Sequence, residues 1–254
     1  VGLIDDSRPL GATPKFIVQI GIAILLAWPL GLRIGEVLGP ILSIILTVLW
    51  IVLVTNAFNF LDNMDGLSAG VAAIASCIFA LAATNAGQVF VPTMAWITVG
   101  ALAGFLVLNF APASIFMGDS GSLVVGYTLS ILTILTTYYD PAEGTKPYGV
   151  LVPIVVLAVP LYDVASVVYH RAKAGQSPFR GDQRHFSHRL VKRGMSQPGA
   201  VLTIYLATAA TALPAIVLPF VTWTMAMLLM AQCLCVLLMS AILEYTRSTD
   251  QASR

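Results

Sequence analysis

Long apolar runs alternate with short polar stretches along nearly the whole chain. Most runs approach the roughly 20 residues that a helix needs to cross a bilayer, and none shows the alternation of a membrane β-barrel strand. Backbone groups within a bilayer must be paired inside the segment, which favours helices. The pattern therefore predicts an all-α, polytopic transmembrane helical bundle of about eight spans, at residues 17–32, 41–58, 67–84, 93–109, 121–139, 149–169, 199–219 and 222–243.

Basic residues are unevenly divided between the two sides that alternate along these spans. All but Arg33 and Lys146 of the 13 Lys and Arg residues fall on the side holding 1–16, 59–66, 110–120, 170–198 and 244–254. The positive-inside rule makes this side cytoplasmic. No soluble domain interrupts the spans, so residues 1–254 are predicted to form a single integral membrane domain.

Composition agrees with this pattern. The chain is 58% hydrophobic and only 10% charged, whereas a soluble domain has about 25% charged residues. Cys77, Cys233 and Cys235 all lie in predicted spans and are interpreted as small packing residues. The chain starts at Val1 without a visible signal peptide, and we expect further N-terminal spans to precede it.

Five polar side chains interrupt the apolar pattern between residues 56 and 65: Asn56, Asn59, Asp62, Asn63 and Asp65. At 100° per residue the three asparagines share an arc of about 60°, and the whole set covers roughly half a helix. That width indicates a helix end that opens into a wet pocket. The alternative is a capping and turn segment before Gly66, because Asn and Asp favour such places.

Further acidic residues fall on the same predicted side. Asp119 stands among small residues in NFAPASIFMGDSGSL (109–123), which lets a ligand approach the backbone, although it could also be the N-cap of the following span. Asp5 and Asp6 are adjacent near Lys15, with a solvated loop as the alternative. Asp163 lies in the inner part of a span.

The longest polar segment, 170–198, adds a cluster of cations to these carboxylates. Clustered carboxylates repel unless a cation intervenes, and Mg²⁺ accepts one or two of them together with substrate phosphate oxygens. His185 and His188, three residues apart, favour phosphate contact over zinc, because no HExxH pattern accompanies them. The segment therefore predicts a phosphoryl-transfer site, with binding to anionic lipid as the alternative.

Taken together, these stretches resemble the polyprenyl-phosphate N-acetylhexosamine-1-phosphate transferases of the glycosyltransferase 4 family, and in particular the undecaprenyl-phosphate GlcNAc-1-phosphate transferase branch. The resemblance covers roughly residues 1–197 and has the motifs in the family's order. The matching stretches are GLIDD (2–6) with Lys15 downstream, NAFNFLDNMDGLSAG (56–70), NFAPASIFMGDSGSL (109–123), and PLYD (160–163) leading to SPFRGDQRHFSHRL (177–190).

The resemblance implies that a UDP-N-acetylhexosamine gives its sugar phosphate to a polyprenyl phosphate and releases UMP, with Mg²⁺ required and Mn²⁺ as an alternative ion. Asp5 and Asp6 match the pair that deprotonates or orients the acceptor phosphate. Asp119 matches the metal-binding aspartate, and Asn59 matches an asparagine of the metal shell. The implied substrate-binding residues are Lys15, Asn56, Asp62, Asp65, Arg184, His185 and His188.

The chain departs from the family pattern at two places. The usual His-x-His-His loop reads His185-Phe186-Ser187-His188, in which Ser187 can donate a hydrogen bond but cannot carry charge. The usual DG-x-DG form reads Asp62-Asn63-Met64-Asp65-Gly66. The expected location is the bacterial inner membrane, among membrane lipids; no nucleic-acid partner is expected, and a homodimer is left open. The alternatives are a transporter with carboxylates at the membrane edge and a membrane scaffold without catalytic activity.

Overall fold

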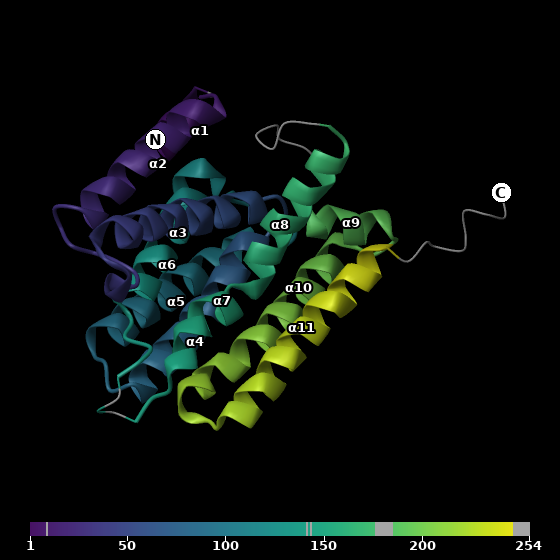
Figure 1. Ribbon diagram of the computed structural model, residues 1–254. Helices are drawn as coiled ribbons and strands as arrows, with labels where there is room; N and C mark the ends of the chain where they lie inside the picture. The colour runs from purple at the N-terminus through teal and green to yellow at the C-terminus, as the bar shows by residue number, and fades with distance from the viewer. Residues whose placement is uncertain (9, 141, 143, 176–184, 246–254) are drawn as a thin grey trace.

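The computed structural model describes residues 1–8, 10–140, 142, 144–175 and 185–245, which fold into an all-α bundle without strands (Figure 1). This confirms the predicted fold class. In chain order the elements are α1 (Gly2–Ser7), α2 (Ala12–Ala27), η1 (Glu36–Leu38), α3 (Pro40–Leu61), α4 (Leu67–Asn85), α5 (Phe90–Asn109), α6 (Gly118–Leu135), η3 (Pro147–Leu151), α7 (Val152–Val156), α8 (Ala158–Lys173), α9 (Phe186–Lys192), α10 (Gln197–Ala212), η4 (Leu213–Ile216), η5 (Leu218–Phe220) and α11 (Trp223–Tyr245).

Six segments of the described chain are long and apolar enough to cross a membrane, or seven if the bent pair around α7 and α8 counts as one span. They are α3, α4, α5, α6, α10 with its 3-10 continuation, and α11. The polytopic arrangement is thus confirmed, but the expected number of about eight is corrected at two places.

The first predicted span, 17–32, has the expected length of 16 residues but is displaced by five residues toward the N-terminus, to Ala12–Ala27. The helix found there is α2, with 16 residues, which at 1.5 Å per residue is about 24 Å long, against roughly 30 Å of bilayer hydrocarbon. Pro29 follows two residues after its end and has no N–H with which to continue the helical ladder.

The predicted span 149–169 is broken rather than continuous. The segment Pro147–Val156 meets Ala158–Lys173 at an angle of 66°. Pro160 explains the break, because its ring lacks the N–H that would bond to the Val156 carbonyl and its bulk opposes that carbonyl. The bend gives α8 a direction different from that of α7.

The centre of the bundle is α4, the most deeply buried of the candidate spans. Its buried face is rich in small residues, which let neighbouring helix backbones approach closely. Those that are fully buried include Ala69, Ala72, Ala75, Ala80 and Ala83. A hydrogen bond also joins α10 to this helix, because the Tyr205 hydroxyl of α10 donates to the Gly66 carbonyl at the start of α4.

The outer helices carry the apolar surface. In Figure 1, α10 and α11 run antiparallel along one edge of the bundle, while α1 and α2 lie at the opposite edge. Large side chains such as Leu228, Leu234 and Ile242 of α11 are more than half exposed. Exposed apolar side chains of this kind are suited to contact with lipid.

Candidate active site

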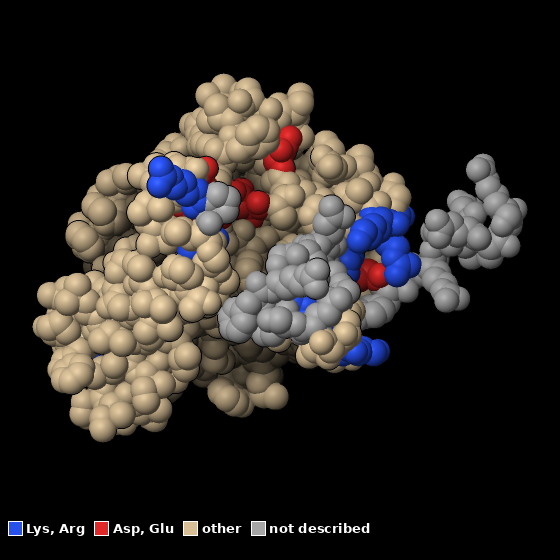
Figure 2. All heavy atoms as spheres, turned by 90° about the horizontal axis from the view of Figure 1, so that it is seen from above, with Lys and Arg blue, Asp and Glu red and all other residues tan. Residues whose placement is uncertain are grey.

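Four side chains from four helices meet in one hydrogen-bonded group, the Lys15 cluster, which consists of Asp5, Lys15, Asn59 and Asp119. Lys15 Nζ lies 3.0 Å from Asp5 Oδ2 and 2.7 Å from Asp119 Oδ2. The other Asp119 oxygen accepts a hydrogen bond of 2.9 Å from Asn59 Nδ2. Seen from above in Figure 2, acidic side chains occupy a hollow in the surface.

Asp6 supports this cluster from the side. Its two carboxylate oxygens accept hydrogen bonds from the backbone N–H groups of Asp119 (2.9 Å) and Ser120 (3.0 Å), in the first turn of α6. These bonds to Ser120 and Asp119 hold the pKa of Asp6 below its usual value. Gly118 makes the approach possible, because it adopts φ of +63° and any Cβ there would lie 3.0 Å from the Asp6 carboxylate.

A second glycine allows α1 to reach α6. A Cβ on Gly2 would lie 2.5 Å from Ser120 Cα, so only glycine permits this contact between the two backbones. Asp5, one turn further along α1, accepts from Leu10 N at 2.7 Å, and its hydrogen bond with Lys15 lowers its pKa. The sequence GLIDD therefore places both carboxylates against α6.

Asp62, the residue that follows α3, faces the same acidic region. Burial raises its pKa to about 6, the charge of Asp119 adds to the effect, and a backbone hydrogen bond from Gly118 partly opposes it. Four carboxylates (Asp5, Asp6, Asp62 and Asp119) thus share this region with Lys15. An excess of negative charge of this kind favours a bound cation.

The donor set fits magnesium better than zinc. Within the part of the chain that the structure describes, no three His, Cys, Asp or Glu side chains group closely enough to hold a metal by themselves. Mg²⁺ needs only one or two protein carboxylates and completes its shell with water and substrate phosphate. Asp119 offers a partly exposed carboxylate, and Asn59 can offer an amide oxygen beside it.

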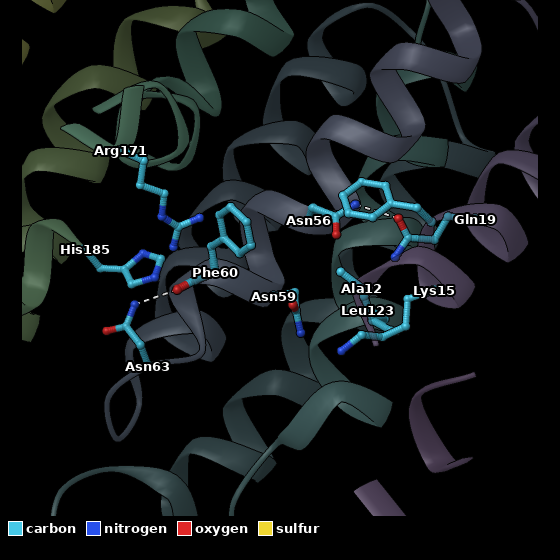
Figure 3. Close-up of a pocket in the computed structure, with 11 residues that line it drawn as sticks. Ala12, Lys15, Gln19, Asn56, Asn59, Phe60, Asn63, Leu123, Arg171 and His185 are labelled. Carbon is cyan, nitrogen blue, oxygen red and sulfur yellow. Dashed lines mark hydrogen bonds between the residues drawn. The ribbon is translucent and has the colours of Figure 1, made fainter. Parts of the chain in front are cut away.

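A pocket of about 350 Å³ opens beside the Lys15 cluster (Figure 3). One wall is the face of α3 that carries the asparagines, as the spacing predicted. Its lining includes Lys15, Asn56, Asn59, Phe60, Arg171 and His185. Amide, guanidinium and imidazole groups therefore surround one cavity, a combination suited to a polar, anionic ligand.

Residues 1–137 match the family model described as glycosyl transferase family 4. The chain belongs to glycosyl transferase family 4. The matched region contains α1 to α6, and therefore every residue of the Lys15 cluster.

Named relatives of this family 4 chain are bacterial. It is 36% identical over 231 residues to a probable undecaprenyl-phosphate N-acetylglucosaminyl 1-phosphate transferase of Bacillus subtilis (strain 168), covering 87% of this chain and 63% of the relative. It is 39% identical over 233 residues to a decaprenyl-phosphate N-acetylglucosaminephosphotransferase of Mycolicibacterium smegmatis, covering 81% and 57%. An Escherichia coli (strain K12) undecaprenyl-phosphate alpha-N-acetylglucosaminyl 1-phosphate transferase is 27% identical over 227 residues, covering 84% and 60%. The chain thus spans about six tenths of the length of these relatives.

The family 4 chain does not bring every predicted site residue to the pocket. Asp65 instead accepts from Ala113 N at 3.0 Å and so fixes the loop between α5 and α6. His188 lies on α9 with its ring centroid 6.4 Å from that of His185, outside the pocket lining. Arg184 lies outside the described residues.

The alternatives raised by the sequence have separate outcomes. A turn role accounts for Asp65, whereas Asn56 and Asn59 line the pocket. Asp119 is not the N-cap of its helix, because α6 begins at Gly118 and Met117 precedes it. The family 4 match does not support a transporter.

Among the residues that line the pocket, sequence reasoning missed the polar or aromatic side chains of Gln19, Phe60 and Arg171. Gln19 had a usable signal, since it is the polar residue four positions after Lys15 on an apolar helix and therefore shares its face. It accepts a hydrogen bond from Asn56 Nδ2. Arg171 had no usable signal in the sequence, because it is one of many cations in its segment.

Proposed function

We propose that this protein transfers N-acetylhexosamine 1-phosphate from a UDP-sugar to a polyprenyl phosphate such as undecaprenyl phosphate. An oxygen of the acceptor phosphate attacks the phosphorus that carries the sugar, the bond to UMP breaks, and a lipid-linked diphosphate sugar forms. The observation that carries the proposal is the convergence of Asp5, Lys15, Asn59 and Asp119 in one hydrogen-bonded cluster. The names of the bacterial relatives supply the substrate class.

The Lys15 cluster offers a role for each side chain. Asp119 and Asn59 would hold Mg²⁺, which supplies neutralisation of the donor diphosphate charge when bound. Lys15, placed between two carboxylates, is within reach of the same phosphates. Asp5 faces the reacting groups and orients the acceptor phosphate or takes its proton. Asp6, with both oxygens held by α6, keeps Asp119 in place.

The pocket beside the cluster suits the donor. The amides of Asn56 and Asn59 can bond to the nucleotide and sugar, while Arg171 and His185 can face phosphate oxygens. The predicted location is the cytoplasmic side of a bacterial plasma membrane. There a soluble nucleotide sugar can meet a lipid phosphate held at the membrane surface, and the distribution of Lys and Arg supports this orientation.

UMP release tests the proposal. The purified protein receives undecaprenyl phosphate, Mg²⁺ and each of several UDP-N-acetylhexosamines. We expect release that requires the lipid phosphate, stops with EDTA, and falls at least about 100-fold in Asp119→Ala, because an interaction with the developing charge is lost.

A matched control separates chemistry from folding. Glu36→Gln removes an exposed carboxylate in η1, and we expect its UMP release to equal that of the parent protein. Folded parent protein that releases no UMP with any sugar of the panel would contradict the proposal.

A further inference from the structure

One buried carboxylate lies outside the acidic region just described. Asp163 of α8 is fully buried, and both of its oxygens are engaged. Oδ2 lies 2.9 Å from His185 Nδ1, and Oδ1 accepts from Phe186 N at 2.7 Å. Burying a carboxyl group costs free energy unless it is hydrogen-bonded. Asp163 is therefore tied to these two partners.

Two contacts fix the His185 ring. Asp163 holds Nδ1, and the Phe60 ring of α3 meets the imidazole edge to face with ring centroids 5.6 Å apart. His185 is 7% exposed, and Figure 3 shows it at the wall of the pocket beside Phe60 and Asn63. The remaining ring nitrogen, Nε2, is the one available to a molecule in the pocket.

We propose that Asp163 is a positioning residue, which accepts a hydrogen bond from His185 Nδ1 and so directs Nε2 into the pocket toward the nucleotide-sugar donor. This inference rests on the proposed transferase function. A carboxylate can only accept, so the ring donates from Nδ1, and a carboxylate behind a functional histidine fixes both the ring orientation and the position of its proton.

Basic side chains surround the same pocket. Arg171 of α8 lines it with its guanidinium carbon 5.8 Å from the Phe60 ring centroid, and Lys15 of α2 lines it as well. His188 of α9 is a further basic neighbour of His185. The His185 ring, held in one orientation, therefore faces a pocket suited to an anionic ligand.

Asp163 also caps the N-terminus of α9. By accepting from Phe186 N it satisfies one of the unpaired N–H groups in the first turn of α9. One carboxylate thus fixes the position of α9 and the orientation of the histidine that precedes it. A test has to separate these two effects.

Asp163→Asn provides the separation. The asparagine side chain keeps the volume of the aspartate and one oxygen, which can still accept a hydrogen bond from Phe186 N. Its NH₂ group cannot accept a hydrogen bond from His185 Nδ1. We expect a thermal midpoint close to that of the parent, and kcat/KM for the UDP-sugar reduced roughly 10- to 100-fold, the usual effect of removing such a partner.

A double variant tests whether Asp163 acts through His185. In a His185→Ala background, adding Asp163→Asn should cause less than about a twofold further loss, because effects that pass through one group are not additive. Glu36→Gln serves as the carboxylate-to-amide control with unchanged rate. An unchanged kcat/KM in Asp163→Asn, or a full additional loss in the His185→Ala background, would overturn the inference.

A readout independent of turnover keeps this inference distinct from the proposed function. The chain has 3 His residues, so ¹⁵N-histidine NMR can be assigned with His170→Gln and His188→Gln. We expect a protonated Nδ1 for His185 that changes to Nε2 protonation in Asp163→Asn. Parent protein with this signature but without UMP release would contradict the transferase alone. A His185 without Nδ1 protonation would contradict the inference, whatever the activity.

Discussion

Single residues at the active site differ in what holds them. Lys15 pairs with two carboxylates, Asp6 is held by backbone amides, and Asp62 is buried beside like charge. The surroundings of Lys15 and Asp6 stabilise their charged forms, whereas those of Asp62 disfavour its charged form. The charge state of Asp62 is therefore the point at which pH and bound cations should act most strongly.

Asp62 gives a pH dependence whose sign can be worked out. Its pKa is raised to about 6 from the ordinary aspartate value of 3.8, so the folded protein binds the proton more tightly than the unfolded chain. This stabilisation is complete below about pH 4 and is lost as the pH rises through about 6, with a size of up to about 3 kcal/mol before solvent screening reduces it. We expect the thermal midpoint of the parent protein to fall over this range more steeply than that of Asp62→Asn.

Magnesium provides the matching control. If Mg²⁺ binds at Asp119 it should lower the pKa of Asp62, because a nearby cation favours the carboxylate. Adding Mg²⁺ should therefore flatten the pH dependence in the parent protein and leave Asp62→Asn unchanged. Identical pH dependence in the two proteins without metal would show that Asp62 is not the group that titrates.

At the scale of elements, the site depends on how closely α3 packs against α6. The two helices carry Asn59 and Asp119, which meet at 2.9 Å. Gly126 of α6 permits the contact, because a Cβ at that position would lie 2.7 Å from Thr55 Cα and 2.8 Å from Thr55 O. Both of these atoms belong to the backbone, so the neighbour cannot simply rotate away.

Gly126→Ala is therefore expected to push α3 and α6 apart. Inserting one methyl group into a close contact of this kind costs about 1–3 kcal/mol in the free energy of unfolding. Unfolding in SDS would measure the loss, and UMP release should fall with it because Asn59 moves away from Asp119.

Gly104→Ala on α5 is the matched substitution, since nothing lies within 4 Å of a Cβ there. It should be neutral or slightly stabilising, because alanine favours the helix over glycine. Equal stability of the two alanine variants would contradict the packing argument for Gly126.

Sequence reasoning reached the spans and the location of the site for clear physical reasons. Hydropathy decides which segments are helices in a bilayer, and the motifs with Asp5, Asn59 and Asp119 all fell at the same predicted membrane side. Sequence reasoning could not predict which groups these side chains bind. That Asp6 would bind the α6 amides, or that Asp163 would bind His185, depends on the depth and rotation of packed helices, which no local pattern encodes.

At the scale of the whole molecule, the last helix is joined to the histidine segment near the pocket. Glu244 of α11 lies 2.9 Å from Arg189 Nε of α9 and accepts from the Tyr162 hydroxyl of α8 at 3.0 Å. The Glu244 side chain is almost fully buried, and Arg189 Nη2 also donates to Ser166 Oγ of α8 at 2.7 Å. The contacts connect α8, α9 and α11 at one end of the bundle.

Glu244→Gln tests this connection. Removing one partner leaves Arg189 without its buried counter-charge, and we expect a loss of about 3 kcal/mol in the free energy of unfolding. The SDS-unfolding midpoint would measure it, with exposed Glu36→Gln as the control that stays at the parent value.

The double variant Glu244→Gln/Arg189→Gln decides whether the pair itself is responsible. Each single variant breaks the same ion pair, so the double variant should be less destabilised than the sum of the two single variants, by at least about 1 kcal/mol. Because α9 begins at the residue after His185, UMP release should follow the same order of variants. Strict additivity in stability would mean that Arg189 and Glu244 act separately, and that α11 stabilises the bundle without holding the histidine segment in place.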